Sequence, residues 1–219
     1  MPRLARPWLA ALAAGAALLV GAARPARAQG KVEIVLPAKE ALATQGPSIR
    51  TTRIVTAPHT AELIRNGFPA RLHYKLERWS AGQFVNDLKS QNEWEVIVEF
   101  DALNKEFRVV RATADRAVLV GAYDSLATAD SAVAADYRPR IGLPKPGERS
   151  YYRLALTVEA MSLSDLDEVR RWLRGELRPA VRGRRNPGTA VTSGVRTLFV
   201  RILGGERLRY DANTGVFKP

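Results

Sequence analysis

The chain has 219 residues, 26% of them charged, with 34 lysines and arginines against 22 acids and no cysteine. The absence of cysteine excludes disulfides, thiolate metal sites and thiolate catalysis, so side-chain packing must hold the fold together. A formal net charge of +12 makes the protein strongly basic, which favours anionic partners.

The first 28 residues are typical of a secretory signal peptide. Two arginines precede an uncharged apolar run over 7–23, and Ala26 and Ala28 form the small-x-small pattern that a signal peptidase accepts before Gln29. An uncleaved membrane anchor is the alternative. A run of this length spans about 25 Å as a helix, short of a hydrocarbon core of about 30 Å. We therefore expect cleavage, export to the periplasm or the extracellular space, and a mature single domain over 29–219.

The charge of the mature chain bears on its partner. Removal of the signal peptide takes away four arginines and no acid, and lowers the formal charge from +12 to about +8. Export makes nucleic acid a poor partner, so the charge points to a membrane surface of anionic lipid, a cell-wall polymer or an acidic protein. The alternative is that the charge serves solubility alone.

The first half of the mature chain is rich in strand patterns. Hydrophobic alternation and β-branched residues predict strands over 31–36, 70–79, 94–101, 106–111 and 116–123, with a less regular extended piece over 50–56. A loop over 38–48 and a short helix over 58–66, which begins at Pro58 and stops at Gly67, separate the first strands. In the clearest strand the inward face holds Trp94, Val96, Val98 and Phe100. Its outward face holds Glu95, Glu99 and Asp101, which we expect to be solvated.

Helices and loops dominate the second half. Ser125 can cap a helix that runs to about residue 136, and a proline-, glycine- and arginine-rich loop over 138–149 leads to a strand over 151–160. A helix over 163–177 follows, with acids in its first turn and arginines in its last. After a loop over 179–188, an amphipathic stretch over 191–203 is expected to pack on the core. Its alternative is a membrane-surface helix, and an extended tail with Leu208, Tyr210 and Phe217 closes the chain.

This order of elements defines the expected fold class. Runs of neighbouring strands without regular β-α-β alternation favour an α+β fold, with an antiparallel β-sheet or sandwich covered by two to three helices.

Two blocks of the chain resemble a known family. The segment over 63–72, Leu-Ile-Arg-Asn-Gly-Phe-Pro-Ala-Arg-Leu, continues to Trp79, and the segment over 151–159 continues to Leu166 and Trp172. Both resemble blocks of the bacterial domain of unknown function 4390 family, and the similarity covers about 55–203. The resemblance implies an exported or membrane-associated bacterial protein without an assigned activity, in a family with some members encoded near sensor kinases. It implies no site residue.

Arginines supply the candidate binding residues. Four of them, Arg178, Arg182, Arg184 and Arg185, lie within eight residues beside prolines and glycines, and a second basic loop holds Arg138, Arg140, Lys145 and Arg149. Guanidinium groups match phosphate and carboxylate groups in shape and charge. We expect the first group to contact an anionic partner; the alternative is that these arginines complement a helix dipole or are simply solvated.

Catalytic and metal-binding patterns are weak. His59 and His73 have no metal-ligand spacing, and we expect both at the surface. Glu95 and Glu99 would lie roughly 13 Å apart on one strand face, too far for paired glycosidase carboxylates. Ser193 lacks the nucleophile-elbow pattern. The sequence therefore predicts no metal, no cofactor and no catalytic residue.

Three hypotheses for function follow. The first is an exported, non-catalytic binding or scaffolding module of the cell envelope. The second is an envelope hydrolase with an unrecognised site, which a concave pocket holding His59 or His73 beside a carboxylate would favour. The third is an accessory protein to a membrane sensor kinase, which only the family resemblance suggests.

Overall fold

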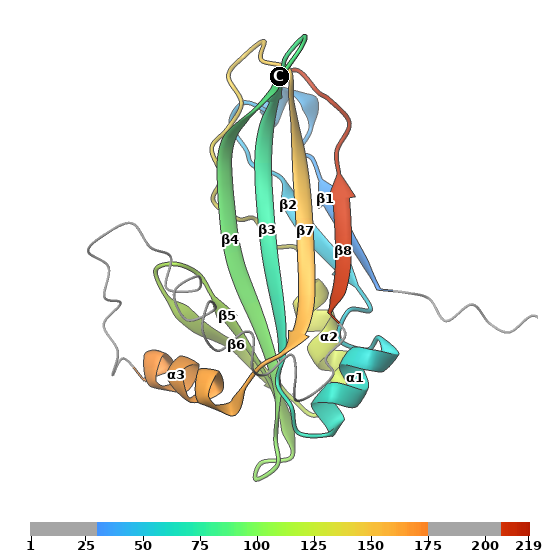
Figure 1. Ribbon diagram of the computed structural model, residues 1–219, viewed down its shortest axis with the longest axis vertical. Coiled ribbons are helices and arrows are strands. Elements are labelled where there is room, and N and C mark those ends of the chain that lie inside the picture. The colour runs from blue at the N-terminus through green and yellow to red at the C-terminus, as the bar shows by residue number, and fades with distance from the viewer. Residues whose placement is uncertain (1–29, 175–206) are drawn as a thin grey trace, which may run out of the picture.

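The computed structural model describes residues 30–174 and 207–219 (Figure 1). Their elements, in chain order, are β1 (Lys31–Val35), the 3-10 turn η1 (Lys39–Ala41), β2 (Ser48–Thr52), α1 (Pro58–Arg65), β3 (Ala70–Ala81), β4 (Asn86–Asp101), β5 (Glu106–Ala112), β6 (Ala117–Tyr123), α2 (Leu126–Ala134), β7 (Ser150–Ala160), α3 (Leu163–Leu173) and β8 (Leu208–Asn213). Within these ranges, no helix combines the length and the apolar character needed to cross a membrane.

The strands form two antiparallel sheets. Six of them make a large sheet in the order β6-β5-β4-β3-β7-β8, and β1 and β2 make a separate pair. In the large sheet, Tyr74 of β3 lies opposite Trp94 on one side and Leu156 on the other. The expected α+β fold with an antiparallel sheet and a few helices is confirmed.

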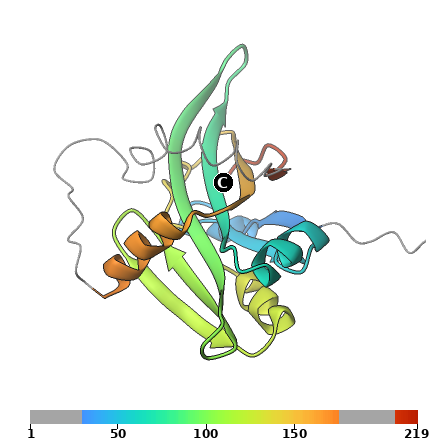
Figure 2. The same cartoon turned by 60° about the horizontal axis from the view of Figure 1, so that its bottom comes forward.

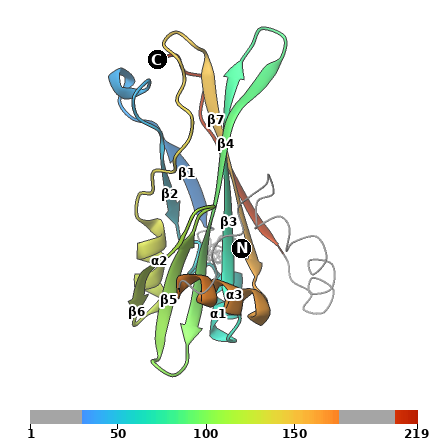
Figure 3. The same ribbon diagram turned by 90° about the vertical axis from the view of Figure 1, so that its left-hand side faces the viewer.

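The main core lies on one face of the large sheet, called here the inner face. The small sheet, α1 and α2 cover this face, as the side view shows (Figure 3). Alternating residues of the three central strands supply the core: Leu72, Tyr74, Leu76, Trp94, Val96, Val98, Tyr152, Leu154, Leu156 and Val158, each at most 3% exposed. The opposite, outer face carries α3.

Most predicted elements are confirmed. The short helix α1 begins at Pro58 and is followed by Gly67 with a φ of +84°, a left-handed conformation that glycine adopts without strain. Ser125 caps α2, because its side chain accepts a hydrogen bond from the Thr128 backbone N–H at 3.2 Å. The predicted tail contains β8, which pairs with β7 and extends the sheet.

Three expectations need correction. β4 begins at Asn86 rather than near Trp94, so β3 and β4 form a long hairpin. Phe100 shares the inner face but lies near the end of its strand and is 36% exposed, in contact with Phe107. Glu99 is not solvated: it is 4% exposed, because α3 lies over the outer face.

Some expectations concern residues outside the described ranges. They are the signal peptide with Ala26, Ala28 and Gln29, the last turn of the helix over 163–177, and the basic loop and amphipathic stretch over 178–203.

Candidate functional site

The helix α3 is fixed to the outer face of the large sheet by a small apolar cluster. Leu166 of α3 is 4% exposed and packs with Ile97 of β4, Val110 of β5 and Met161, which are at most 5% exposed. Ser162 begins the helix: its hydroxyl accepts a hydrogen bond from the Asp165 backbone N–H at 3.1 Å. Figure 2 shows α3 lying across the strands.

An ion pair adds a second attachment. Arg170 of α3 donates a hydrogen bond to Glu99 of β4 at 2.8 Å, and the Glu99 carboxylate also lies 4.0 Å from Arg108 of β5. The Glu99 side chain is 5% exposed, whereas that of Arg170 is 42% exposed. Since the pair joins a buried acid to a half-exposed base, it fixes the helix position and keeps the guanidinium near the surface.

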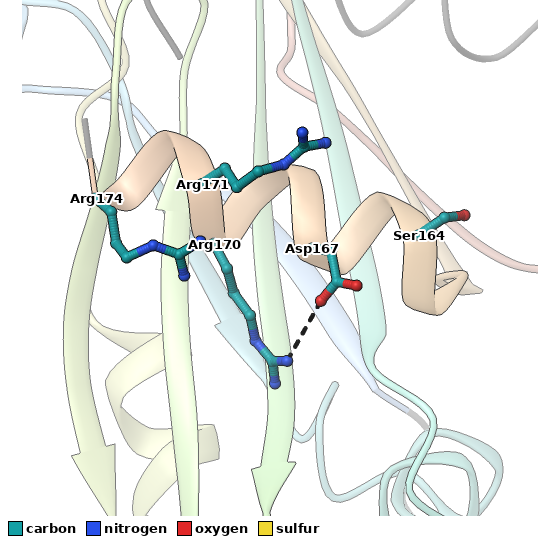
Figure 4. Close-up of a pocket in the computed structure, with 5 residues that line it drawn as sticks. All are labelled: Ser164, Asp167, Arg170, Arg171 and Arg174. Carbon is teal, nitrogen blue, oxygen red and sulfur yellow. Dashed lines mark ion pairs between the residues drawn. The ribbon is translucent and has the colours of Figure 1, made fainter. Parts of the chain in front are cut away.

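The side of α3 away from the cluster is cationic. A depression of about 450 Å³ is lined by Ser164, Asp167, Arg170, Arg171 and Arg174, three guanidinium groups against one carboxylate (Figure 4). Ser164, Asp167, Arg171 and Arg174 follow one another at intervals of three or four residues and therefore lie along one side of the helix, with Arg170 at the edge of that side nearer the sheet. Asp167 lies 3.6 Å from Arg170, so its charge is already offset. We call this surface the α3 arginine face.

The charges of the α3 arginine face suit an anion. Arg171 and Arg174 are exposed, and in Figure 4 the Arg171 side chain points away from the pair between Asp167 and Arg170. Within the described ranges, Arg171 forms no ion pair or hydrogen bond. Exposed guanidinium groups can bind phosphate or carboxylate groups in bidentate fashion.

Only some of the arginines singled out from the sequence lie within the described residues. Arg178, Arg182, Arg184 and Arg185 follow α3 in sequence and lie outside the described residues, as do Ala26, Ala28 and Gln29. The loop before β7 carries its basic residues, Arg138, Arg140, Lys145 and Arg149, at the surface. From the sequence alone, Arg170, Arg171 and Arg174 are expected only to complement the helix dipole.

His73 lies in a charged row on the outer face, which the sequence did not predict. Its ring nitrogens lie 3.6 Å from Glu93 and 3.4 Å from Glu95. Arg71 hydrogen-bonds to the same Glu95 carboxylate and lies 3.6 Å from Glu159. The expectation of a solvated Glu95 is therefore wrong as well, since its side chain is 17% exposed and has two partners.

The environment of Glu95 shifts its titration. Burial raises the pKa of this carboxyl, but hydrogen bonds from His73 and Arg71 and the charge of Arg71 outweigh burial, and the pKa lies below its usual value. Glu95 is thus held in its ionised form at neutral pH. The depression on the α3 arginine face does not include His73, and no cluster of three potential metal-ligating side chains occurs among the residues in the two described ranges.

Comparison with known proteins returns no relative. No protein-family model matches the chain, and no curated protein or solved structure matches it. The comparisons therefore supply no function, and the residues of this chain have to supply the argument.

Proposed function

We propose that this chain is an exported, non-catalytic binding or scaffolding module of the cell envelope, and that an anionic partner docks on the α3 arginine face. The observation that carries the proposal is the set of three guanidinium groups along one side of a helix attached to the sheet. Attachment matters because a fixed cationic surface loses less conformational entropy on binding than a flexible one.

Two features of the sequence extend the proposal. The signal peptide over 1–28, with Ala26 and Ala28 before the cleavage point at Gln29, would deliver the protein to the compartment where anionic lipids and wall polymers lie. The four arginines from Arg178 to Arg185 come shortly after α3 in the sequence and add four positive charges to the segment that follows it. The resemblance to the domain of unknown function 4390 family fits an envelope protein and stays a prediction.

The competing explanation is that these arginines only stabilise the helix. Basic residues near a helix C-terminus interact favourably with its dipole, by about 0.3–1 kcal/mol each at exposed positions. The two explanations differ in what the arginines change. A dipole role predicts lost stability with unchanged binding, whereas a docking role predicts lost binding with nearly unchanged stability.

The test is co-sedimentation of the mature protein with anionic vesicles and with purified cell wall. The variant R171S/R174S removes two charges from the α3 arginine face and leaves the pair between Arg170 and Glu99 intact. The control K39S/R65S removes two exposed charges from other elements. We expect the wild type and the control to sediment together with one of the two materials, and the α3 variant to remain in solution. Equal sedimentation of all three proteins would contradict the proposal.

One observation favours the alternative of an envelope hydrolase. His73 lies beside Glu93 and Glu95, an arrangement that can hold an imidazole in a defined orientation. The variant H73A would abolish hydrolysis of esters or wall fragments if this row were catalytic. Activity of the wild type that H73A removes, with unchanged stability, would establish the hydrolase in place of the binding module.

A further inference from the structure

A second cationic pocket lies on the other side of the large sheet from α3. Its lining residues come from the β5–β6 hairpin and from the segment after α2. The helix α2 itself contacts both β5 and β6, beside which it lies in Figure 3. The cavity has a volume of about 110 Å³ and is lined by Arg111, Thr113, Arg116, Val118, Val120 and Tyr137.

The central residue of this pocket is Arg111. It lies opposite Val96 in the ladder and shares the inner face with it, so the strand directs a charged side chain toward the main core. Its guanidinium carbon lies 4.3 Å from the centre of the Tyr137 ring, and that ring packs against Trp94 at 5.2 Å. The arginine is therefore half-buried at the end of an aromatic stack.

Arg111 lacks the partner that comparable arginines have. Arg71 pairs with Glu95, Arg78 with Glu148 and Arg170 with Glu99. Among the described residues, none pairs with Arg111, and its buried Nε atom has no hydrogen-bond acceptor. No carboxylate lines the pocket, whereas a second guanidinium, that of Arg116, does.

This arrangement leaves the positive charge of Arg111 without a negatively charged partner among the described residues. Partial withdrawal of a guanidinium from water has a desolvation cost, and the cation–π contact with Tyr137 offsets only part of that cost. An anion in the cavity would supply the missing partner. Apart from Thr113, the remaining wall is apolar and is formed by Val118, Val120 and the Tyr137 ring, so the best occupant combines one anionic head with a compact apolar body.

We propose that this pocket binds a small organic carboxylate, with its head on Arg111 and Arg116 and its apolar body against Val118 and Val120. A planar carboxylate matches the guanidinium fork in bidentate fashion. Inorganic phosphate fits less well, because the oxygens that do not contact the two guanidinium groups would face the apolar side chains of Val118 and Val120. The proposal is independent of the partner on the α3 arginine face, which lies on the opposite face of the sheet.

The experiment is isothermal titration of the mature protein with sodium isovalerate and sodium benzoate. Benzamide, which lacks the charge, and inorganic phosphate, which lacks the apolar body, are the comparison ligands. We expect saturable binding of at least one carboxylate and at least tenfold weaker binding of both comparison ligands. Absence of saturable binding by either carboxylate, or phosphate binding of equal strength, would overturn the assignment.

Variants locate the binding site and separate it from a structural role of Arg111. R111Q and R116Q should each weaken carboxylate binding at least tenfold, and the control K39Q should bind like the wild type. V118W keeps both charges and fills the cavity; because Val118 is 43% exposed, the larger side chain can be accommodated without disturbing the core. If R111Q fails to fold, the carboxylate affinities of R116Q and V118W test the site. Wild-type affinity in both would refute the site.

Discussion

Replacement of Val98 by Asp tests the assignment of the inner face. Val98 is fully buried and lies between Ala70 and Val109 in the sheet. Truncation to Ala should cost about 2 kcal/mol through lost burial and the cavity left behind. Aspartate adds a carboxyl with no partner. Burying its neutral form costs about 1–3 kcal/mol more, and a pKa raised to about 7 or above adds about 4 kcal/mol at pH 7, the cost of protonating a group whose ordinary pKa is about 3.9. Since domains are stable by about 5–15 kcal/mol, V98D should be nearly or fully unfolded.

Urea titration at pH 7 and pH 5 measures the effect, with V98A as the control. A carboxyl whose pKa is raised in the folded state stabilises the fold less as the pH rises, so lowering the pH should restore V98D. Over two pH units the difference between V98D and V98A should shrink by up to about 2.7 kcal/mol. Equal stability of the two variants at pH 7, or a difference that does not change with pH, would refute the placement of this residue.

Three further predictions concern other parts of the molecule. L166A should lower the free energy of unfolding by about 2–3 kcal/mol in urea titration, at the low end for Leu to Ala because the α3 cluster is small and can collapse; an unchanged value would mean that α3 does not pack there. E95Q should destabilise the fold by about 1–3 kcal/mol at pH 7 because Arg71 loses its carboxylate. Since the pKa of Glu95 is lowered in the fold, this contribution is fully present above about pH 4.3 and is lost as the pH falls through the lowered folded-state pKa, so the difference between wild type and E95Q should shrink with acidification below about pH 4.3. N-terminal sequencing of the exported protein should begin at or near Gln29, and recovery of an intact Met1 end in the membrane would exclude cleavage.

The residues on the inner face of the large sheet can be predicted well from the sequence, because the pattern that reveals them lies within each strand. Alternation such as Leu72, Tyr74 and Leu76 reports which face of a strand is buried, and it is visible within a few residues. The first part of β4 is not predictable in this way. Its residues over 86–91 are polar apart from the exposed Leu88, and they form a strand because β3 pairs with them, which the pattern within β4 does not reveal.

The burial and pairing of residues on the outer face depend on contacts between segments that are distant in sequence, so local patterns do not predict them. Glu99 is buried because α3, about seventy residues later, returns across the sheet. One local signal did exist: Ile97 and Val110 are apolar at outward positions of adjacent strands, opposite the apolar stripe of α3. The neighbours of His73 likewise follow from strand register, which places Glu95 directly opposite His73 in the ladder.

The salt dependence of binding by the α3 arginine face tests the central proposal most directly. Screening shortens the range of charge interactions from about 10 Å at 0.1 M salt to about 3 Å at 1 M. The bound fraction of the wild type on its anionic material, vesicles or cell wall, should therefore fall steeply over this range. Compared with the K39S/R65S control, R171S/R174S should bind weakly at low salt and show a shallower dependence. Identical salt curves for the two variants would contradict docking on α3.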